Sequence, residues 1–339
     1  MTYRVLMTAA KFVGCEAYAR DFLRQHGCQL IEHERHRAMS EAALCELVPE
    51  ADGLISGLEP VTERVFARAP RLRVVCAPGV GYDHIDVAAA TRRGIAVCIC
   101  AGSNNQAVAE HAFGLLLALA RQICAADRAV RDGGWPRLPG PELWGKTLGI
   151  VGLGRVGRSA ALIGRGFGMR VLATDVEWDT TFATAHQVSY VSLPRLLAEA
   201  DVVSLHCPLT PETRGLIDEA ALARMKPTAY LINTARGPVV DEAALVRALR
   251  EGQIAGAGLD VFDLEPHPRN PYVDLPNVLL TSHIAGATHE ALERSLELAL
   301  LNVVQVLQGR EPVCQVNRLD GAAGGTVGSL SGERARAGD

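Results

Sequence analysis

Two α/β domains, each containing a doubly wound parallel sheet, are the fold that this sequence predicts. The first observation is its length of 339 residues, which suits about two domains with 48% hydrophobic and 21% charged residues. The second is a regular alternation of short apolar runs with segments of helical period. Strands that alternate with helices favour parallel sheets, because each parallel pair of strands needs a crossover connection.

The first series of elements extends to about Cys100. We expect strands at Arg4–Thr8, Gly53–Ser56, Leu72–Ala77 and Ala96–Cys100, and helices at Glu16–His26, Thr62–Ala69 and Ile85–Arg93. The turn APGVGYDHID follows the third strand, at the carboxyl edge where open α/β sheets bind ligands. Backbone N–H groups of Val80 and Gly81 could hold a carboxylate there. Taken alone, the turn could equally be a plain connection.

A long helical pattern, Asn104–Arg131, separates the two series and ends in a Gly- and Pro-rich segment. The second series contains the strands and helices Thr147–Val151, Ser159–Phe167, Arg170–Thr174, Leu193–Ala200, Val202–His206, Asp218–Met225, Ala229–Asn233, Asp241–Glu251, Gly256–Val261 and Val278–Thr281. A final amphipathic helix is predicted over Thr288–Leu307. We expect residues 317–339 to be a disordered tail, because they contain little to bury.

The second series begins with a strand, a glycine-rich turn and a helix. In GLGRVG, Gly152 permits the turn, Gly154 lets backbone N–H groups approach a pyrophosphate, and Gly157 lets helix and strand pack closely. Asp175 ends the next strand, 23 residues after Gly152 (175 − 152), where it could accept hydrogen bonds from ribose hydroxyls. A lone motif of this kind is a weak signal, but here the flanking elements and the acid also fit. The stretch predicts a Rossmann unit that binds a dinucleotide.

Three polar segments follow strands of the second series. They bring a cation, Arg236, a carboxylate, Glu265, and an imidazole, His283, to the rim where the cofactor would lie. Arg236 could bind a substrate carboxylate in a forked geometry. His283 could deliver a proton, since Glu265 beside it would favour the charged imidazole. Each residue also has an ordinary alternative role. Arg236 could form a surface ion pair, Glu265 could be a solvated turn residue, and His283 could be a structural histidine.

Composition excludes several other classes of protein. The net charge of −4 gives no electrostatic basis for binding nucleic acid or a membrane surface. Nine scattered cysteines suit a reducing compartment, and Cys98 and Cys100 lack the second ligand pair of a metal site. The first residues, MTYRVLMTAAKFVG, lack the apolar core of a signal sequence, and no segment offers the roughly 18 apolar residues of a membrane span. We therefore expect a cytoplasmic protein with small-molecule partners and no metal.

The motifs VGLGRVG with Asp175, NTARGPVVDE, GLDVFDLEP and TSHIAGAT together resemble those of the D-isomer-specific 2-hydroxyacid dehydrogenases, a family that includes phosphoglycerate dehydrogenase and hydroxypyruvate reductases. The resemblance spans about Leu54 to Pro312. It implies that His283 is the proton donor and acceptor, Glu265 its partner and Arg236 the cation that orients the substrate. Val80, Gly81 and Asn104 would bind substrate. The implied cofactor is NAD, bound by Gly152, Gly154, Arg155, Val156, Gly157, Asp175, Pro208, Thr213, Ala235, Asp260 and Gly286.

The resemblance also implies a domain organisation. A discontinuous, flavodoxin-like substrate domain would comprise residues 1–101 and 285–316, and an NAD-binding Rossmann domain residues 102–284, with substrate bound in a cleft between them. A homodimer built on the cofactor domains is implied as well. The chain ends without the regulatory extension of longer phosphoglycerate dehydrogenases, which makes serine feedback through such a domain unexpected.

The expected activity is NAD-dependent interconversion of a small 2-oxo acid and its D-2-hydroxy acid, as in glyoxylate and hydroxypyruvate reductases. Ser56 and Ala77 stand where phosphoglycerate dehydrogenases typically carry arginines for the phosphate, which argues against a phosphorylated substrate. Two alternatives stay open: 3-phosphoglycerate dehydrogenase, and an NAD-sensing corepressor that keeps the same residues. Ser282 departs from the family, which commonly has proline before the histidine.

Overall fold

The computed structural model describes residues 2–31, 33 and 39–319. It divides into two compact units. One comprises the chain up to Cys100 together with the chain from Leu296 onward, and the other comprises Ala101–Ser295. The division at Leu296 falls inside the last helix, eleven residues after the boundary predicted from the family resemblance.

The first unit contains a five-stranded parallel sheet in the order β2-β1-β3-β4-β5. This is the flavodoxin-like order, with its switch point between β1 and β3. The strands are β1 (Tyr3–Met7), β2 (Cys28–Ile31), β3 (Gly53–Ile55), β4 (Val74–Ala77) and β5 (Ala96–Ile99). The helices are α1 (Glu16–Gln25), α2 (Glu41–Leu47), α3 (Glu63–Arg68) and α4 (Val87–Arg92), with 3-10 turns η1 (Ala10–Phe12) and η2 (Val48–Glu50).

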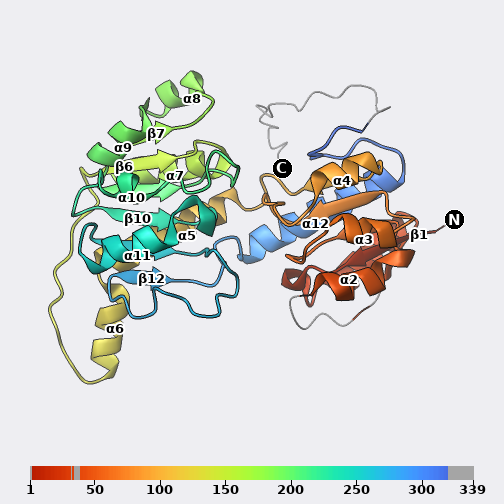
Figure 1. Ribbon diagram of the computed structural model, residues 1–339, viewed down its shortest axis with the longest axis horizontal. Coiled ribbons are helices and arrows are strands. Elements are labelled where there is room, and N and C mark those ends of the chain that lie inside the picture. Colours follow the sequence, from red (N-terminus) through yellow and green to blue (C-terminus); the bar gives the residue numbers. More distant parts are fainter. Residues whose placement is uncertain (1, 32, 34–38, 320–339) are drawn as a thin grey trace, which may run out of the picture. The chain divides into compact units, whose positions relative to one another are not determined.

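The second unit contains a seven-stranded parallel sheet in the order β12-β11-β10-β9-β6-β7-β8 (Figure 1). Counted from β6, the first six strands follow the Rossmann order, with the switch point between β6 and β9. The strands are β6 (Thr147–Val151), β7 (Arg170–Thr174), β8 (Val188–Tyr190), β9 (Val202–Leu205), β10 (Tyr230–Asn233), β11 (Gly256–Leu259) and β12 (Val278–Leu280). The helices are α5 (Asn105–Ala120), α6 (Ile123–Arg131), α7 (Arg155–Gly166), α8 (Thr180–Ala185), α9 (Leu193–Glu199), α10 (Glu219–Leu222) and α11 (Glu242–Arg250), with the 3-10 turn η3 (Gly237–Val239). The last helix, α12 (His289–Leu307), begins in this unit and ends in the first.

Both sheets confirm the predicted fold class. Their central strands are buried on both faces, as β4 and β9 illustrate with four buried residues each. Parallel strands covered by helices on both sides require such continuous apolar runs. Helix starts follow from the sequence too: the side chains of Asp86, Asp218 and Asp241 each accept a hydrogen bond from a backbone N–H in the first turn of the helix they precede. An N-cap of this kind typically stabilises a helix by about 1 kcal/mol.

The predicted helix over Asn104–Arg131 is wrong in its continuity. Gln122 has a left-handed backbone conformation, with φ of 51°, and α5 and α6 meet there at an angle of 60°. Helix α5 carries eight buried residues, whereas α6 carries none. In Figure 1, α6 stands clear of the sheet of its own unit. Apolar residues recur at helical spacing through both helices, so the pattern gave no sign of the break.

The structure also contains short elements that the apolar pattern did not predict, notably β2, β8, α2 and α8. Helix α7 begins at Arg155, four residues earlier than predicted. Asn317, the first residue of the predicted tail, is buried, and its side chain accepts from the backbone N–H of Val97 and donates to the carbonyl oxygen of Ile95. Packed structure therefore extends past the predicted start of the tail, and residues 320–339 lie outside the described part of the chain.

No single helix in the described part of the chain is long and apolar enough to cross a membrane.

Candidate active site

The glycine-rich turn lies at the carboxyl end of β6, and each of its glycines has a physical reason. Gly152 has φ of 93°, and a Cβ there would lie 2.6 Å from the backbone nitrogen of Cys207. A Cβ on Gly157 would lie 2.0 Å from the carbonyl oxygen of Gly152. A Cβ on Gly154 would meet nothing within 4 Å, so this side of the turn is open. The turn is tight where it packs and open where a ligand would approach.

Helix α7 begins directly after Gly154, with Arg155 and Val156 in its first turn and no side-chain cap. Uncapped N–H groups and the helix dipole at such a terminus favour an anion. The donor set and the open space at Gly154 fit the pyrophosphate of a dinucleotide. Arg155 also extends towards Gly102, since its Nη1 would lie 3.6 Å from a Cβ at that glycine.

Asp175 follows β7 at the same edge of the sheet. Its carboxylate accepts from the backbone N–H of Leu153 at 2.6 Å and from that of Val176 at 2.7 Å. One oxygen therefore braces the glycine turn. A third, longer bond comes from the N–H of Glu177 at 3.5 Å. A carboxylate has about four lone-pair sites, so three accepted bonds leave capacity for a ribose hydroxyl.

A second loop at this edge follows β9 and contains Pro208 and Thr213. The Thr213 hydroxyl donates to the carbonyl oxygen of Pro208 at 2.6 Å and accepts from the N–H of Thr210 at 2.8 Å. Because β9 and β6 flank the switch point, this loop and the glycine turn meet at one place. The structure thus brings together the cofactor residues predicted for both loops.

His206 lies between β9 and that loop and was not predicted as a functional residue. Its Nε2 lies 2.9 Å from the Ser204 hydroxyl, and its Nδ1 is buried with no hydrogen-bond partner among the described residues. Burial lowers the pKa of His206 from 6.5 to about 4, so the ring is neutral at physiological pH. Burial likewise raises the pKa of the neighbouring Cys207 thiol to about 11, which makes the thiolate scarce.

Arg236 lies in the loop that follows β10. The buried Asn233 side chain shapes this loop: it donates to the carbonyl oxygen of Arg236 at 2.9 Å and accepts from the N–H of Ala235 at 3.0 Å. The Arg236 Nη1 donates to the carbonyl oxygen of Ala235 at 2.7 Å. A Cβ on Gly237 would lie 2.1 Å from the carbonyl carbon of Phe262, so the Arg236 loop packs directly on the loop that carries Glu265.

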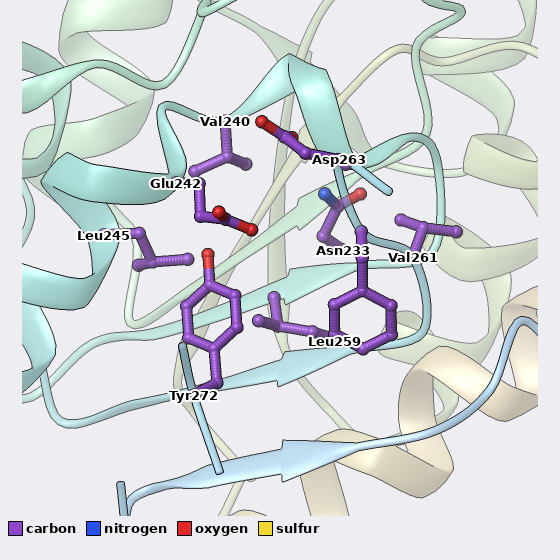
Figure 2. A pocket seen from close by; sticks show the side chains of 10 residues that line it. Asn233, Val240, Glu242, Leu245, Leu259, Val261, Asp263 and Tyr272 are labelled. Atoms are coloured by element: carbon purple, nitrogen blue, oxygen red, sulfur yellow. The ribbon is translucent and has the colours of Figure 1, made fainter. Parts of the chain in front are cut away.

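A small cavity lies beneath these two loops. Figure 2 shows the side chains of Asn233, Glu242, Asp263 and Tyr272 around it. Its volume of about 10 Å³ is near the minimum for one water molecule, so it is not a substrate pocket. Burial raises the pKa of the Asp263 carboxyl.

Glu265 and His283 are paired. The Glu265 Oε2 lies 2.5 Å from the His283 Nδ1, and its Oε1 accepts from the N–H of Phe262 at 2.9 Å. His283 has a left-handed φ of 56°. The carboxylate occupies Nδ1 and therefore leaves Nε2 as the nitrogen that can exchange a proton with a ligand.

Asp260 positions the turn that carries His283. It is fully buried, and its Oδ1 accepts from the Thr281 hydroxyl at 2.6 Å and from the N–H of Ile284 at 2.9 Å. Its Oδ2 accepts from the N–H of Ala285 at 2.9 Å. Burial acts to raise the pKa of Asp260, but these bonds and the nearby His111 outweigh it and hold the pKa below its usual value. Contact with the nicotinamide, as the resemblance implies, stays a prediction.

Asn104 and Gly286 lie against each other at the start of α5. A Cβ on Gly286 would be 2.8 Å from the Asn104 Nδ2, and the Asn104 Oδ1 is a buried acceptor with no partner among the described residues. Gly286 is thus needed for close approach. Asn104 directly precedes α5. Its contact with substrate, as the resemblance implies, stays a prediction.

In the first unit, the turn at Val80 and Gly81 follows β4 at the carboxyl edge, as predicted. The Gly79 carbonyl oxygen accepts from the N–H of Cys100 at 2.8 Å. Ser56, which follows β3, is buried with its hydroxyl 3.2 Å from the His84 Nε2. Arg71 pairs with Asp52 at 3.0 Å just before β4, at the opposite end of the strand. Lys11 was not predicted as a functional residue, yet its Nζ donates to the carbonyl oxygen of Pro78 in the turn.

Comparisons with known proteins agree with this geometry. Residues 113–285 match the family model described as D-isomer specific 2-hydroxyacid dehydrogenase, NAD binding domain. A glyoxylate reductase of Korarchaeum cryptofilum is 46% identical over 287 residues, which are 82% of this chain and 86% of that protein. The crystal structure of the TT0316 protein from Thermus thermophilus is 41% identical, with a TM-score of 0.84 over 93% of this chain and all of that one. That of D-lactate dehydrogenase from Aquifex aeolicus, complexed with NAD and lactic acid, is 29% identical, with a TM-score of 0.80 over 90% of this chain and 96% of that one.

The chain belongs to the D-isomer-specific 2-hydroxyacid dehydrogenases. It is an NAD-dependent enzyme that interconverts 2-oxo acids and 2-hydroxy acids, as the sequence motifs predicted. In the described residues, no three His, Cys, Asp or Glu side chains gather in a way that could hold a metal ion.

Proposed function

We propose that the enzyme reduces a small unphosphorylated 2-oxo acid, such as glyoxylate or hydroxypyruvate, to the D-2-hydroxy acid with NADH. The observation that carries this proposal is the Glu265–His283 pair, held beside the fully buried Asp260 in the NAD-binding unit. The name glyoxylate reductase, carried by a relative 46% identical to this chain, supports the choice of substrate class.

His283 is the proton donor in this proposal. Bound NADH supplies the hydride for the substrate carbonyl carbon. The Nε2 of His283 gives a proton to the carbonyl oxygen, while Glu265 on Nδ1 stabilises the positive imidazolium before transfer. Asp260 fixes the backbone that follows His283, because it accepts from Ile284 and Ala285. Arg236 binds the substrate carboxylate and polarises the carbonyl.

Asp175 is the residue that favours NADH over NADPH. Its carboxylate follows β7 close to the glycine turn, where it would accept hydrogen bonds from the hydroxyls of an adenosine ribose. A 2′-phosphate would be repelled by this carboxylate, and no Lys or Arg follows within Val176–Thr181 to offset the repulsion.

The case against a phosphorylated substrate rests on Ser56 and Ala77. Both are fully buried in the first unit and carry no charge. A phosphate needs charge-assisted hydrogen bonds, each contributing about 1.5–3 kcal/mol. Arg71 cannot provide one at the substrate turn, since it is paired with Asp52 at the other end of β4, and the Lys11 ammonium near the turn binds the Pro78 carbonyl oxygen.

In this proposal the first unit binds the substrate through Val80 and Gly81, and the second unit binds NAD.

We also propose a homodimer in which α6 and the segment after it contact the second subunit. Helix α6 buries none of its residues in the monomer. Trp135 and Trp144 in the following segment are 85% and 76% exposed, which is unusual for so large an apolar side chain. Sedimentation of wild type and of Trp135→Ala tests this: we expect a dimer and a weakened dimer, and a monomeric wild type would contradict it.

The substrate proposal is tested by initial rates with glyoxylate, hydroxypyruvate and 3-phosphohydroxypyruvate, each measured with NADH and with NADPH. We expect kcat/KM to be higher for the two unphosphorylated acids and for NADH. A preference for 3-phosphohydroxypyruvate would instead indicate phosphoglycerate dehydrogenase. NADH binding without turnover of any of the three acids would favour an NAD-sensing corepressor.

A further inference from the structure

Lys11 joins two parts of the first unit that are distant in sequence. It lies in η1, just after β1, and its ammonium donates to the carbonyl oxygen of Pro78, 67 residues away, at the turn that follows β4. The order β1-β3-β4 places one strand between them. At about 4.8 Å per strand, the lysine side chain bridges roughly 10 Å across the end of β3.

Two consecutive carbonyl groups of the turn are held in this way. Lys11 holds that of Pro78, and the backbone N–H of Cys100 holds that of Gly79 at 2.8 Å. In a trans peptide the C=O and N–H groups point in opposite directions. Fixing the Pro78 carbonyl oxygen towards Lys11 therefore directs the N–H group of Gly79 away from the lysine, and fixing the Gly79 carbonyl oxygen towards Cys100 directs the N–H group of Val80 away from β5. A Cβ on Gly79 would meet nothing within 4 Å, so this face of the turn is open.

Lys11 lies at the edge of the sheet where a ligand is expected. It follows β1, next to the switch point between β1 and β3, and open α/β sheets bind ligands at the carboxyl edge there. Burial lowers the pKa of Lys11 from its usual value. The ammonium lies 5.2 Å from the centre of the buried Phe12 ring, and this contact acts against that shift by favouring the charged form. The positive charge of Lys11 thus lies behind the peptide that carries the N–H group of Gly79.

We infer that Lys11 is a positioning residue for the substrate carboxylate: it fixes the Pro78–Gly79 peptide so that the N–H group of Gly79 faces the open side of the turn, where the carboxylate binds, and its charge strengthens that binding. This inference rests on the proposed function, because it takes a 2-oxo acid as the ligand of the turn. It extends the predicted donors, Val80 and Gly81, to Gly79.

The test compares wild type with Lys11→Met, Lys11→Arg and a control, Lys146→Met. Methionine keeps the length of the stem and removes the charge and the donor, whereas arginine keeps both. Lys146 is an exposed lysine of the second unit. Each protein is assayed for KM and kcat with glyoxylate, and for the Kd of NADH. The Kd of oxamate is measured on the NADH-loaded protein by calorimetry, because oxamate has the same carboxylate beside a carbonyl but is not reduced. Thermal unfolding reports folding.

We expect Lys11→Met to raise the glyoxylate KM and the oxamate Kd by about tenfold or more, the usual effect of one lost charge-assisted contact. The kcat and the NADH Kd should stay within about twofold, as should all values for Lys146→Met. Lys11→Arg should restore most of the affinity for oxamate. A purely structural lysine would instead lower the unfolding temperature and impair NADH and oxamate binding together.

The inference is overturned if Lys11→Met binds oxamate within about twofold of wild type, or if Lys11→Arg is as weak as Lys11→Met. Should Lys11→Met fail to fold, Lys11→Arg alone decides: near-normal oxamate binding supports the inference and a loss of about tenfold overturns it. If wild type binds oxamate but does not reduce glyoxylate, the proposed function is contradicted. The oxamate Kd of the Lys11 variants would still test the role of Lys11.

Discussion

Protonation of His206 should make the stability of the NAD-binding unit depend on pH. The pKa of this buried ring is about 4 in the folded protein and 6.5 when exposed. A depressed folded pKa means that the unfolded chain binds the proton more tightly, so its contribution is fully present above pH 6.5 and is lost as the pH falls towards 4. The complete loss is up to about 3 kcal/mol, and about 2 kcal/mol should be lost between pH 7.5 and pH 5.

The same protonation should affect the cofactor turn. A Cβ on Gly152 would lie 2.8 Å from the carbonyl carbon of His206, so the backbone of this histidine packs on the turn that receives the pyrophosphate. A charged ring here would disturb both stability and NADH binding.

The assay is urea unfolding of wild type, His206→Asn and a control, His289→Asn, at pH 7.5 and pH 5. His289 is exposed. We expect the free energy of unfolding of wild type and of the control to fall by about 2 kcal/mol more than that of His206→Asn between these pH values. An equal fall in all three proteins would refute the assignment of a buried neutral ring.

Three further predictions concern the site. Asp175→Ser should weaken the preference for NADH over NADPH in kcat/KM, because a repulsive carboxylate is removed; an unchanged ratio would contradict its assigned role. Gly157→Ala should raise the NADH Kd by about tenfold, since its Cβ would lie 2.0 Å from the Gly152 carbonyl oxygen, whereas Gly166→Ala, with no neighbour within 4 Å, serves as the control. Fluorescence titration with NADH measures the Kd of Gly157→Ala and of Gly166→Ala. Equal NADH affinities of the two variants would count against the packing argument. Glu265→Gln should lower kcat on the order of tenfold to a hundredfold without weakening NADH binding, because the imidazolium loses its negative partner; a normal kcat would remove Glu265 from this role.

Local patterns were sufficient for much of the fold and for part of the site. The glycines at 152, 154 and 157 and the acid at 175 lie within one βαβ unit, so their spacing alone predicted their meeting at one turn. The pairing of Glu265 with His283 followed from their positions after neighbouring strands, β11 and β12, and from the family resemblance. Parallel order brings such strand ends to one edge.

Features that depend on long-range packing could not be predicted in this way. The contact from Lys11 to Pro78 requires the order of β1, β3 and β4, which no local pattern specifies. The buried setting of His206 depends on how the β9 loop packs against the glycine turn. The break at Gln122 has no glycine or proline to mark it, and it became visible only because α5 is buried and α6 is not.

The most direct test of the account is the turnover of glyoxylate with NADH by wild type and by His283→Ala, with the NADH Kd of both proteins measured alongside. If His283 delivers the proton, the variant should bind NADH normally and lose at least about a hundredfold in kcat, as expected for a lost general acid. Retention of more than about a tenth of the wild-type kcat would contradict that role, because even the lower end of a general acid's contribution exceeds this loss.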